Sequence, residues 1–181
     1  ALSPDGSRPF DEGSNGFVMG EGAAVFVLRR LSDAEKDGDN ILAVIRGIGA
    51  ASDGKGKGIT APNPRGQKQA IERAYADAGV PVSSVDYVEC HGTSTPVGDV
   101  VETQVLSDVL SADGASAGSV AIGSVKSQIG HLKGAAGAAA LLKVVLGLIH
   151  GERYPSINVK TPNPKVGFGT GPLRLQGTVE P

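Results

Sequence analysis

Apolar and polar residues alternate along the chain in blocks whose lengths are typical of strands and helices. The runs "GAAVFVLRRL" at 22–31 and "ILAVIRGIGA" at 41–50 are rich in β-branched and apolar residues, which favours two strands. The polar stretch "SDAEKDGDN" between them is typical of a helical turn followed by a connection. The pattern of this region therefore predicts two strands joined by a short helical segment.

A helix is predicted from residue 64 to residue 78, with a start and a stop signal. Asn63 can act as the N-cap, Pro64 occupies the first helical position, and Gly79 ends the helix. The apolar positions repeat with helical spacing, which predicts one face turned toward the protein. That face consists of Ala70, Ile71, Ala74, Tyr75 and Ala78.

The rest of the chain continues as strands and helices in turn. A strand "VDYVEC" ends at Cys90, a helix covers about 100–110, a strand lies in "SVAIGSVKS", an apolar helix spans 132–149, and "YPSINV" is a final extended piece. This alternation predicts an α/β fold: a mixed sheet of about four or five strands with helices on both faces.

The apolar helix contains the longest apolar run of the chain, "AAGAAALLKVVLGLI" at 135–149. Its length approaches that of a membrane span, but Lys143 and Gly147 interrupt it. Gly and Ala crowd its first turns, which favours close packing against other elements. We therefore expect the most buried helix of the fold here, and no membrane contact.

Composition narrows the class of protein. The chain has 181 residues, 40% hydrophobic content and a net charge of -2, which favours one domain over residues 1–181. Aromatic residues make up only 4% and no basic run occurs, so nucleic-acid binding is not expected. A single cysteine excludes an internal disulfide and argues against a structural zinc site. It also favours a reducing, cytoplasmic location. The opening stretch "ALSPDGSRPF" has no apolar signal core, which favours the same location.

The candidate chemistry lies where strands end and helices begin. "CHGTSTPVGDVVE" carries His91 after one strand, and "SVKSQIGHLKGAAG" carries Lys126 and His131 after another. Cys90 and His91 are neighbours in sequence, and neighbouring side chains on a strand point to opposite faces, so Cys90 is predicted to be a small buried hydrophobic residue. His91 and His131 occupy equivalent corners and are expected to face one cavity.

Several of these residues also have ordinary structural interpretations. Asp99 and Glu102 have the spacing of a capping box at the start of a helix. Thr93 and Thr95 can stabilise the turn that contains them. The third histidine, His150, lies at the C-terminal end of the apolar helix, where the helix dipole favours it, and no catalytic role is assigned to it.

Four blocks of the sequence resemble the β-ketoacyl synthase family of condensing enzymes, and most closely the ketosynthases of polyketide and polyunsaturated fatty acid synthases. They are "RPFDEGSNGFVMGEGAAVFVLRRLSDAEKDGD", "GKGITAPNPRGQKQAI", "ECHGTSTPVGDVVETQVL" and "GSVKSQIGHLKGAAGAAALLKVVLGL". The resemblance implies a thiolase-like fold made of two similar halves, of which this chain is similar to the C-terminal half only. The nucleophilic cysteine of the family belongs to the other half and has no counterpart here.

The resemblance also implies roles for individual residues. His91 and His131 match the two histidines that stabilise the enolate formed when a malonyl thioester loses carbon dioxide, Lys126 and Glu102 match the lysine and acidic residue behind them, and Thr93 and Thr95 match threonines that contact the pantetheine arm. No metal or separate cofactor is implied, because the substrates are carried on the phosphopantetheine of an acyl carrier protein.

The implied partners are that carrier protein and the N-terminal ketosynthase half, in a homo- or hetero-oligomer. A non-catalytic partner subunit similar to a chain-length factor is the main alternative, although it would not need His91, Lys126 and His131. An unrelated cysteine hydrolase that uses Cys90 is disfavoured, because no "GxCxG" elbow occurs in the sequence.

Overall fold

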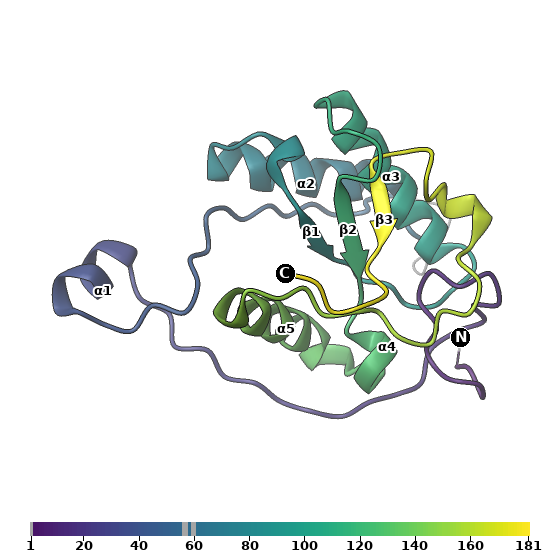
Figure 1. Ribbon diagram of the computed structural model, residues 1–181, viewed down its shortest axis with the longest axis horizontal. Coiled ribbons are helices and arrows are strands. Elements are labelled where there is room, and N and C mark those ends of the chain that lie inside the picture. The colour runs from purple at the N-terminus through teal and green to yellow at the C-terminus, as the bar shows by residue number, and fades with distance from the viewer. Residues whose placement is uncertain (1, 56–57, 59–60) are drawn as a thin grey trace.

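A computed structural model describes residues 2–55, 58 and 61–181 of the chain (Figure 1). The helical elements and strands follow one another in the order expected of an α/β protein. They are α1 (Leu31–Asp37), α2 (Pro64–Ala78), η1 (Val82–Ser84), β1 (Tyr87–Glu89), α3 (Gly98–Ala112), β2 (Val120–Gly123), α4 (Lys126–Ile129), η2 (Lys133–Ala135), α5 (Ala136–His150), η3 (Pro164–Val166) and β3 (Leu173–Leu175).

The sheet has three strands in the order β1-β2-β3, and both neighbouring pairs are parallel. The α/β class is confirmed, but the expectation of a mixed sheet with four or five strands is wrong for the described residues. The third strand was not predicted, because "LRL" is too short to carry a period-2 signal. In Figure 1, α2 and α3 lie together on one side of the sheet, and α4 and α5 lie on the other.

The two strands predicted at 22–31 and 41–50 are not formed. Both segments are extended but carry no strand hydrogen bonds, and Val25 and Val27 are 93% and 91% exposed. A strand needs a second strand to accept and donate its backbone hydrogen bonds, and the described part of the chain places none beside these segments. The helical turn predicted between them is confirmed as α1.

The core lies between the sheet and α3. Leu106 and Leu110 of α3 pack with Val120 and Ile122 of β2, and Phe10 and Leu173 join the same cluster. Complete burial of side chains of this size contributes about 1.5 to 3 kcal/mol each to stability. Helix α3 is therefore the helix that holds the domain together.

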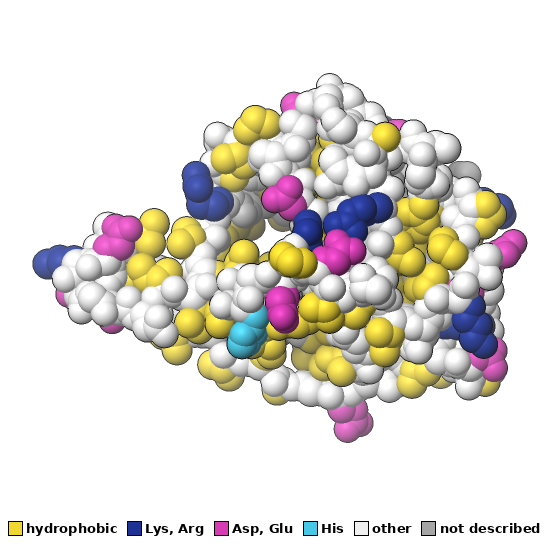
Figure 2. All heavy atoms as spheres, in the orientation of Figure 1, with side chains coloured by type: hydrophobic (Ala, Val, Ile, Leu, Met, Phe, Trp, Pro, Cys, Tyr) yellow, Lys and Arg dark blue, Asp and Glu magenta, His cyan; other side chains and the backbone are white. Residues whose placement is uncertain are grey.

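Helix α5 is more exposed than its composition predicts. Only Ala136 and Lys143 of this helix are buried, whereas Leu142 and Leu148 are 42% and 63% exposed. The expectation that it is the most buried helix is wrong, because the described residues cover one side of it only. By length and composition alone, residues 133–150 could cross a membrane. Figure 2 shows apolar side chains gathered over α5 and along the segment that leads to α1.

Helix α2 follows its predicted signals. The side chain of Asn63 accepts a hydrogen bond from the backbone N–H of Arg65, Pro64 is the first helical residue, and Gly79 closes the helix in a left-handed conformation with φ 65°. The five residues of its predicted inner face are partly buried, whereas most of the other positions are exposed.

The N-terminal segment is bound to parts of the chain that are far away in sequence. Asp11 accepts hydrogen bonds from the backbone N–H groups of Lys160 and Thr161, at 2.7 and 2.9 Å. The backbone N–H of Arg8 donates to the hydroxyl of Ser94 at 2.9 Å. These contacts bring residues 8–20 against the turn that follows β1, where the candidate site begins.

Candidate functional site

The structure brings His91 and His131 together. His91 follows β1, and His131 lies in the turn between α4 and η2. Their ring centroids are 5.6 Å apart and the rings are nearly perpendicular, at 89°. Two imidazoles in this arrangement can both approach one small group placed beside them. The predicted convergence of the two strand-to-helix corners is therefore found in the structure.

The position of His131 is fixed by the N-terminal segment. Its backbone N–H donates to the carbonyl of Val18 at 2.8 Å, and its carbonyl accepts from the N–H of Gly20 at 3.1 Å. The ring of Phe17 packs against the His131 ring with centroids 4.8 Å apart. Gly20 leaves room for this approach, since a Cβ there would lie 2.3 Å from the carbonyl oxygen of Ile129.

One nitrogen of His131 is already engaged. Its Nδ1 accepts a hydrogen bond from the backbone N–H of Lys133 at 3.0 Å, so in the neutral ring the proton resides on Nε2. The Nε2–H group is then the available donor. A neutral imidazole with a fixed tautomer can donate to a developing negative charge without first gaining a proton.

The pKa values of both histidines are lowered. Desolvation, with smaller effects from Lys126 and His131, lowers the pKa of His91 to about 4. Desolvation also lowers the pKa of His131, with Lys126 and Lys133 adding to the effect. Both rings are therefore neutral at neutral pH.

Glu102 acts on the turn that carries His91. Its carboxylate accepts the backbone N–H groups of His91 and Gly92, at 2.6 and 2.9 Å. Desolvation raises the pKa of Glu102, while these two hydrogen bonds and Lys126 oppose that rise. Glu102, which lies on α3, thus fixes the backbone that follows the end of β1.

The capping box predicted for Asp99 and Glu102 is not formed. Helix α3 begins at Gly98, two residues earlier than a capping role for Asp99 requires, and its N-cap is Val97. Asp99 instead accepts the backbone N–H of Phe10 at 2.8 Å, and desolvation raises its pKa to about 6.

Lys126 is buried at the start of α4, with 3% of its surface exposed. Desolvation lowers its pKa, and the nearby carboxylates of Glu102 and Glu89 oppose that change. Its positive charge in turn contributes to the low pKa values of both histidines. The residue therefore influences the site through its charge.

Thr93 and Thr95 lie in the turn between β1 and α3. Their hydroxyl oxygens are 3.1 Å apart, and that of Thr95 accepts the N–H of Gly98 at 3.2 Å. These contacts agree with the interpretation that the two threonines stabilise the turn. Both residues are only partly buried, which leaves them accessible from the side of the turn.

Cys90 is a core residue. It is 3% exposed, belongs to the central apolar cluster, and its backbone N–H donates to the carbonyl of Gly123 at 2.8 Å. Burial raises the pKa of its thiol well above the usual value. A thiol in this environment is a poor nucleophile. His150, the last residue of α5, is far along the chain from the site, as expected.

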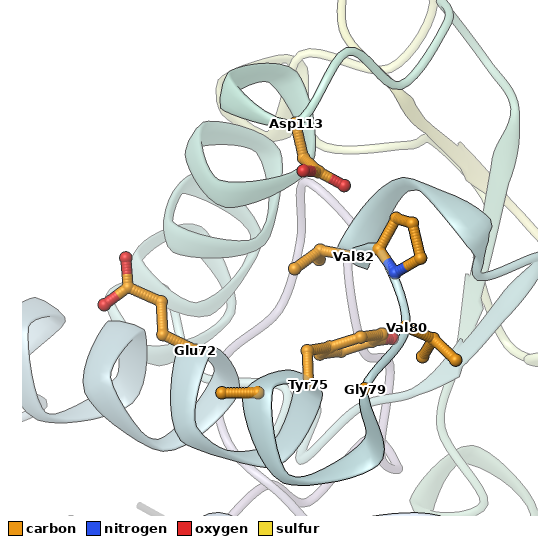
Figure 3. Close-up of a pocket in the computed structure, with 8 residues that line it drawn as sticks. Glu72, Tyr75, Gly79, Val80, Val82 and Asp113 are labelled. Carbon is orange, nitrogen blue, oxygen red and sulfur yellow. The ribbon is translucent and has the colours of Figure 1, made fainter.

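The two histidines lie at an open surface. His91 is exposed and His131 is partly buried, so the described residues do not by themselves form the common cavity that the two rings were expected to face. A hollow elsewhere, between α2, η1 and the end of α3, contains neither histidine (Figure 3). It is lined by Glu72, Tyr75, Gly79, Val80, Val82 and Asp113, among others. Within residues 2–55, 58 and 61–181, no group of His, Cys, Asp and Glu is placed to hold a metal ion.

Sequence reasoning missed two contributors to this region. Phe17 contacts His131, and Glu89 accepts the backbone N–H of Val125 beside Lys126. A buried glutamate at the end of an apolar strand is unusual, and that alone could have marked Glu89. Phe17 carried no comparable signal.

The pKa of His91 gives a direct test. The pKa of His91 is near 6.5 in the unfolded chain and about 4 in the folded protein. Between these two values the unfolded chain binds the proton more readily than the folded protein does. The free energy of unfolding is therefore highest above pH 6.5 and decreases as the pH falls toward 4. NMR titration of histidine-labelled protein is expected to place the His91 midpoint well below 6.5. Lys126→Met should raise that midpoint, because it removes a nearby positive charge. A normal midpoint that does not respond to Lys126→Met would contradict this assignment.

Comparison with known proteins gives two family matches. Residues 42–160 match the family model described as "Beta-ketoacyl synthase, C-terminal domain", and residues 1–34 match the one described as "Beta-ketoacyl synthase, N-terminal domain". The boundary between the two matched regions falls between residues 34 and 42, around the end of α1.

The curated relatives are polyketide synthases. A phenolphthiocerol/phthiocerol polyketide synthase of Mycobacterium tuberculosis is 47% identical over 93% of this chain and 9% of its own length. The 6-methylsalicylic acid synthase of Aspergillus niger is 47% identical over 93% of this chain and 10% of its own length. The chain thus spans about a tenth of the length of these relatives.

Solved structures agree with these relatives. The ketosynthase from module 6 of the bacillaene synthase of Bacillus subtilis matches 99% of this chain with a TM-score of 0.96 and 44% identity, and 32% of that chain is covered. A structure named PfaC Keto synthase-Chain length factor matches 96% of this chain with a TM-score of 0.88 and 42% identity, over 18% of its own length. The thiolase-like fold that the sequence predicted is confirmed.

Proposed function

The chain belongs to the β-ketoacyl synthase family, and from this membership we propose that it supplies the enolate-stabilising side of a polyketide synthase condensing site. The observation that carries the proposal is the nearly perpendicular pair of His91 and His131, with ring centroids 5.6 Å apart and with the proton of His131 placed on Nε2 because Nδ1 accepts from Lys133. The nucleophilic cysteine then belongs to the N-terminal ketosynthase half, because Cys90 is buried in the core.

The reaction proceeds in two stages. An acyl group first moves from a carrier thiol to the nucleophilic cysteine, which forms one thioester and releases another thiol. A malonyl thioester then loses carbon dioxide, and the electron pair of the broken C–C bond passes to the thioester oxygen as an enolate. The enolate carbon attacks the acyl-enzyme carbonyl, a new C–C bond forms, and the cysteine thiolate leaves.

His91 and His131 stabilise the enolate in this scheme. Each donates an N–H group to the thioester oxygen, and a preorganised donor of this kind is worth about 3 kcal/mol in a site from which water is excluded. The low pKa values of both rings keep them neutral, so they donate without carrying a charge of their own. The enclosing walls come from the N-terminal half in this proposal.

Lys126 and Glu102 support the two donors. Glu102 holds the backbone of His91 and Gly92, and Lys126 adds a positive charge that favours the enolate. Thr93 and Thr95 lie at the turn beside His91 and offer hydroxyls to the amides of a pantetheine arm.

The proposed partners are an acyl carrier protein and the N-terminal half, in a homo- or hetero-oligomer. The proposed location is the cytoplasm, and the proposed reaction uses no metal or separate cofactor.

The proposal is tested with a protein that carries this chain together with the N-terminal ketosynthase half. Carbon dioxide release from a malonyl thioester and the mass of the acyl-enzyme are measured separately. Cys90→Ala is expected to leave both intact and to cost about 1 kcal/mol of stability, as a modest core change does. No acyl mass should appear on Cys90.

Two outcomes would contradict the proposal. Loss of acyl transfer in Cys90→Ala would make Cys90 the nucleophile. A protein with both halves that releases no carbon dioxide and forms no product would instead favour the non-catalytic alternative, a partner subunit similar to a chain-length factor.

A further inference from the structure

A buried ion pair joins α5 to the sheet below the candidate site. The Nζ of Lys143 lies 2.9 Å from Oε2 of Glu89, and the two side chains are only 6% and 4% exposed. The hydroxyl of Tyr87 donates to the same carboxylate at 2.6 Å and accepts from Lys143 at 2.9 Å. The three side chains form one connected cluster, which we call the α5 anchor.

The α5 anchor is an uncommon way to attach an apolar helix. Lys143 is the only charged residue of α5, whose sequence is otherwise apolar apart from the terminal His150. Desolvating two charges costs as much free energy as their attraction returns, so a hydrophobic pair of similar volume would attach the helix as well or better. The presence of charges here indicates a role beyond stability.

The other oxygen of Glu89 indicates what that role is. Oε1 accepts the backbone N–H of Val125, the residue directly before α4. Lys126 is the first residue of α4, and the same short segment leads through Gly130 to His131. The carboxylate therefore holds the start of the segment that carries both site residues.

The backbone of β2 is adapted to the anchor. A Cβ at Gly123 would lie 2.6 Å from the Tyr87 hydroxyl and 3.4 Å from the Nζ of Lys143. Gly123 thus leaves the space that the cluster fills, and it ends β2 just before the segment held by Glu89. The anchor, the strand end and the segment form one continuous unit.

We propose that Glu89 and Lys143 are positioning residues for decarboxylation, which set the place of Lys126 and His131 through the backbone of Val125. This inference rests on the function proposed above. Lys143 supplies the counter-charge that keeps the Glu89 carboxylate turned toward Val125. Without it, a nearby alternative cation for that carboxylate is Lys126, whose charge the site needs elsewhere.

The experiment uses a protein with both ketosynthase halves and four variants: Lys143→Met, Glu89→Gln, their double variant and Lys143→Arg. Lys143→Met is expected to lower the kcat of carbon dioxide release by about tenfold to a hundredfold, as a misplacement of about 1 Å does. The KM for the malonyl thioester and the rate of acyl transfer should stay unchanged, because neither depends on this segment.

The double variant separates positioning from mere stability. A glutamine at 89 accepts the Val125 N–H and donates to Tyr87 without needing a counter-charge, so Glu89→Gln should restore much of the kcat lost in Lys143→Met. Lys143→Arg, which keeps the charge, should also retain most of the kcat. Arg174→Gln is the matched control, because it breaks the 2.7 Å ion pair with Glu180 at the opposite edge strand of the sheet. It should leave kcat unchanged.

The outcomes are distinguishable from failure of the proposed function. If both His91→Ala and His131→Ala decarboxylate normally, the function itself is wrong. If the histidine variants fail but Lys143→Met keeps its kcat, or loses acyl transfer in equal proportion, the positioning role is overturned. Should Lys143→Met not fold, Glu89→Leu combined with Lys143→Met replaces the buried ion pair by apolar side chains and removes the acceptor of the Val125 N–H, and an unchanged kcat in that variant overturns the inference.

Discussion

Replacing His131 by alanine is expected to abolish malonyl decarboxylation while leaving acyl transfer to the nucleophilic cysteine intact. Decarboxylation places a negative charge on the thioester oxygen, and the Nε2–H of His131 is oriented to donate because Nδ1 is occupied by the N–H of Lys133. Loss of one such donor lowers a rate by about a hundredfold to a thousandfold. In the proposed mechanism, acyl transfer uses a thiolate activated by its own helix terminus, so it should not need His131.

The measurement separates the two steps in a protein that contains both halves. Labelled carbon dioxide release reports decarboxylation, and intact mass reports the acyl-enzyme. His91→Ala should behave as His131→Ala does, since the two rings lie 5.6 Å apart and both are proposed to donate to the same oxygen. His150→Ala is the control, because that histidine ends α5 and has no part in the pair. Normal decarboxylation in both His91→Ala and His131→Ala would show that the assigned roles are mistaken.

Gly92→Ala is expected to be strongly destabilising, because a left-handed backbone and a steric clash coincide at this position. Gly92 has φ 45°, and a Cβ there would lie 2.6 Å from the Cβ of Ser124, which is fully buried. The left-handed conformation and the overpacking together should lower the free energy of unfolding by about 2 to 5 kcal/mol. The same change would move His91, whose backbone is held through this turn by Glu102.

Gly79→Ala provides the matched control for this prediction. Gly79 also has a positive φ, 65°, but nothing lies within 4 Å of its Cβ position. Only the conformational cost applies there, about 1 to 2 kcal/mol. Urea unfolding of the two variants measures the difference, which isolates the clash with Ser124. Equal losses of stability in both variants would contradict the steric argument.

Local signals allowed the sequence to predict several elements correctly. Helix α2 could be predicted because Asn63, Pro64 and Gly79 act within one helix and need no distant partner. The short helix α1 was predictable for the same reason. Cys90 was correctly predicted as a core residue, since alternation on a strand separates it from His91.

Long-range interactions account for what the sequence did not predict. The runs at 22–31 and 41–50 have strand propensity, yet a strand forms only beside another strand. The burial of α5 was overestimated because composition does not reveal how much of a helix its own chain covers. Asp99 has the spacing of a cap but accepts from Phe10, 89 positions earlier in the chain.

The sequence indicated which residues belong to the candidate site, but not the contacts that hold them in place. His91 and His131 follow two strands that proved to be parallel neighbours, so their side chains meet at one edge of the sheet. The pairing of Lys143 with Glu89 could not be predicted, because the two residues lie in separate elements and their patterns are independent. The contacts of the N-terminal segment with His131 could not be predicted either.

The attachment of the N-terminal segment has a consequence for synthesis of the protein. Asp11 is held by Lys160, 149 positions later in the chain. At the usual rate of translation, roughly 7 to 30 s pass before the ribosome has made both residues. Throughout this interval residues 8–20 cannot dock completely, so Val18 and Gly20 do not yet hold the backbone of His131. The arrangement around His131 is therefore completed only after residue 160 has been made, although every residue that contacts the ring comes earlier in the chain.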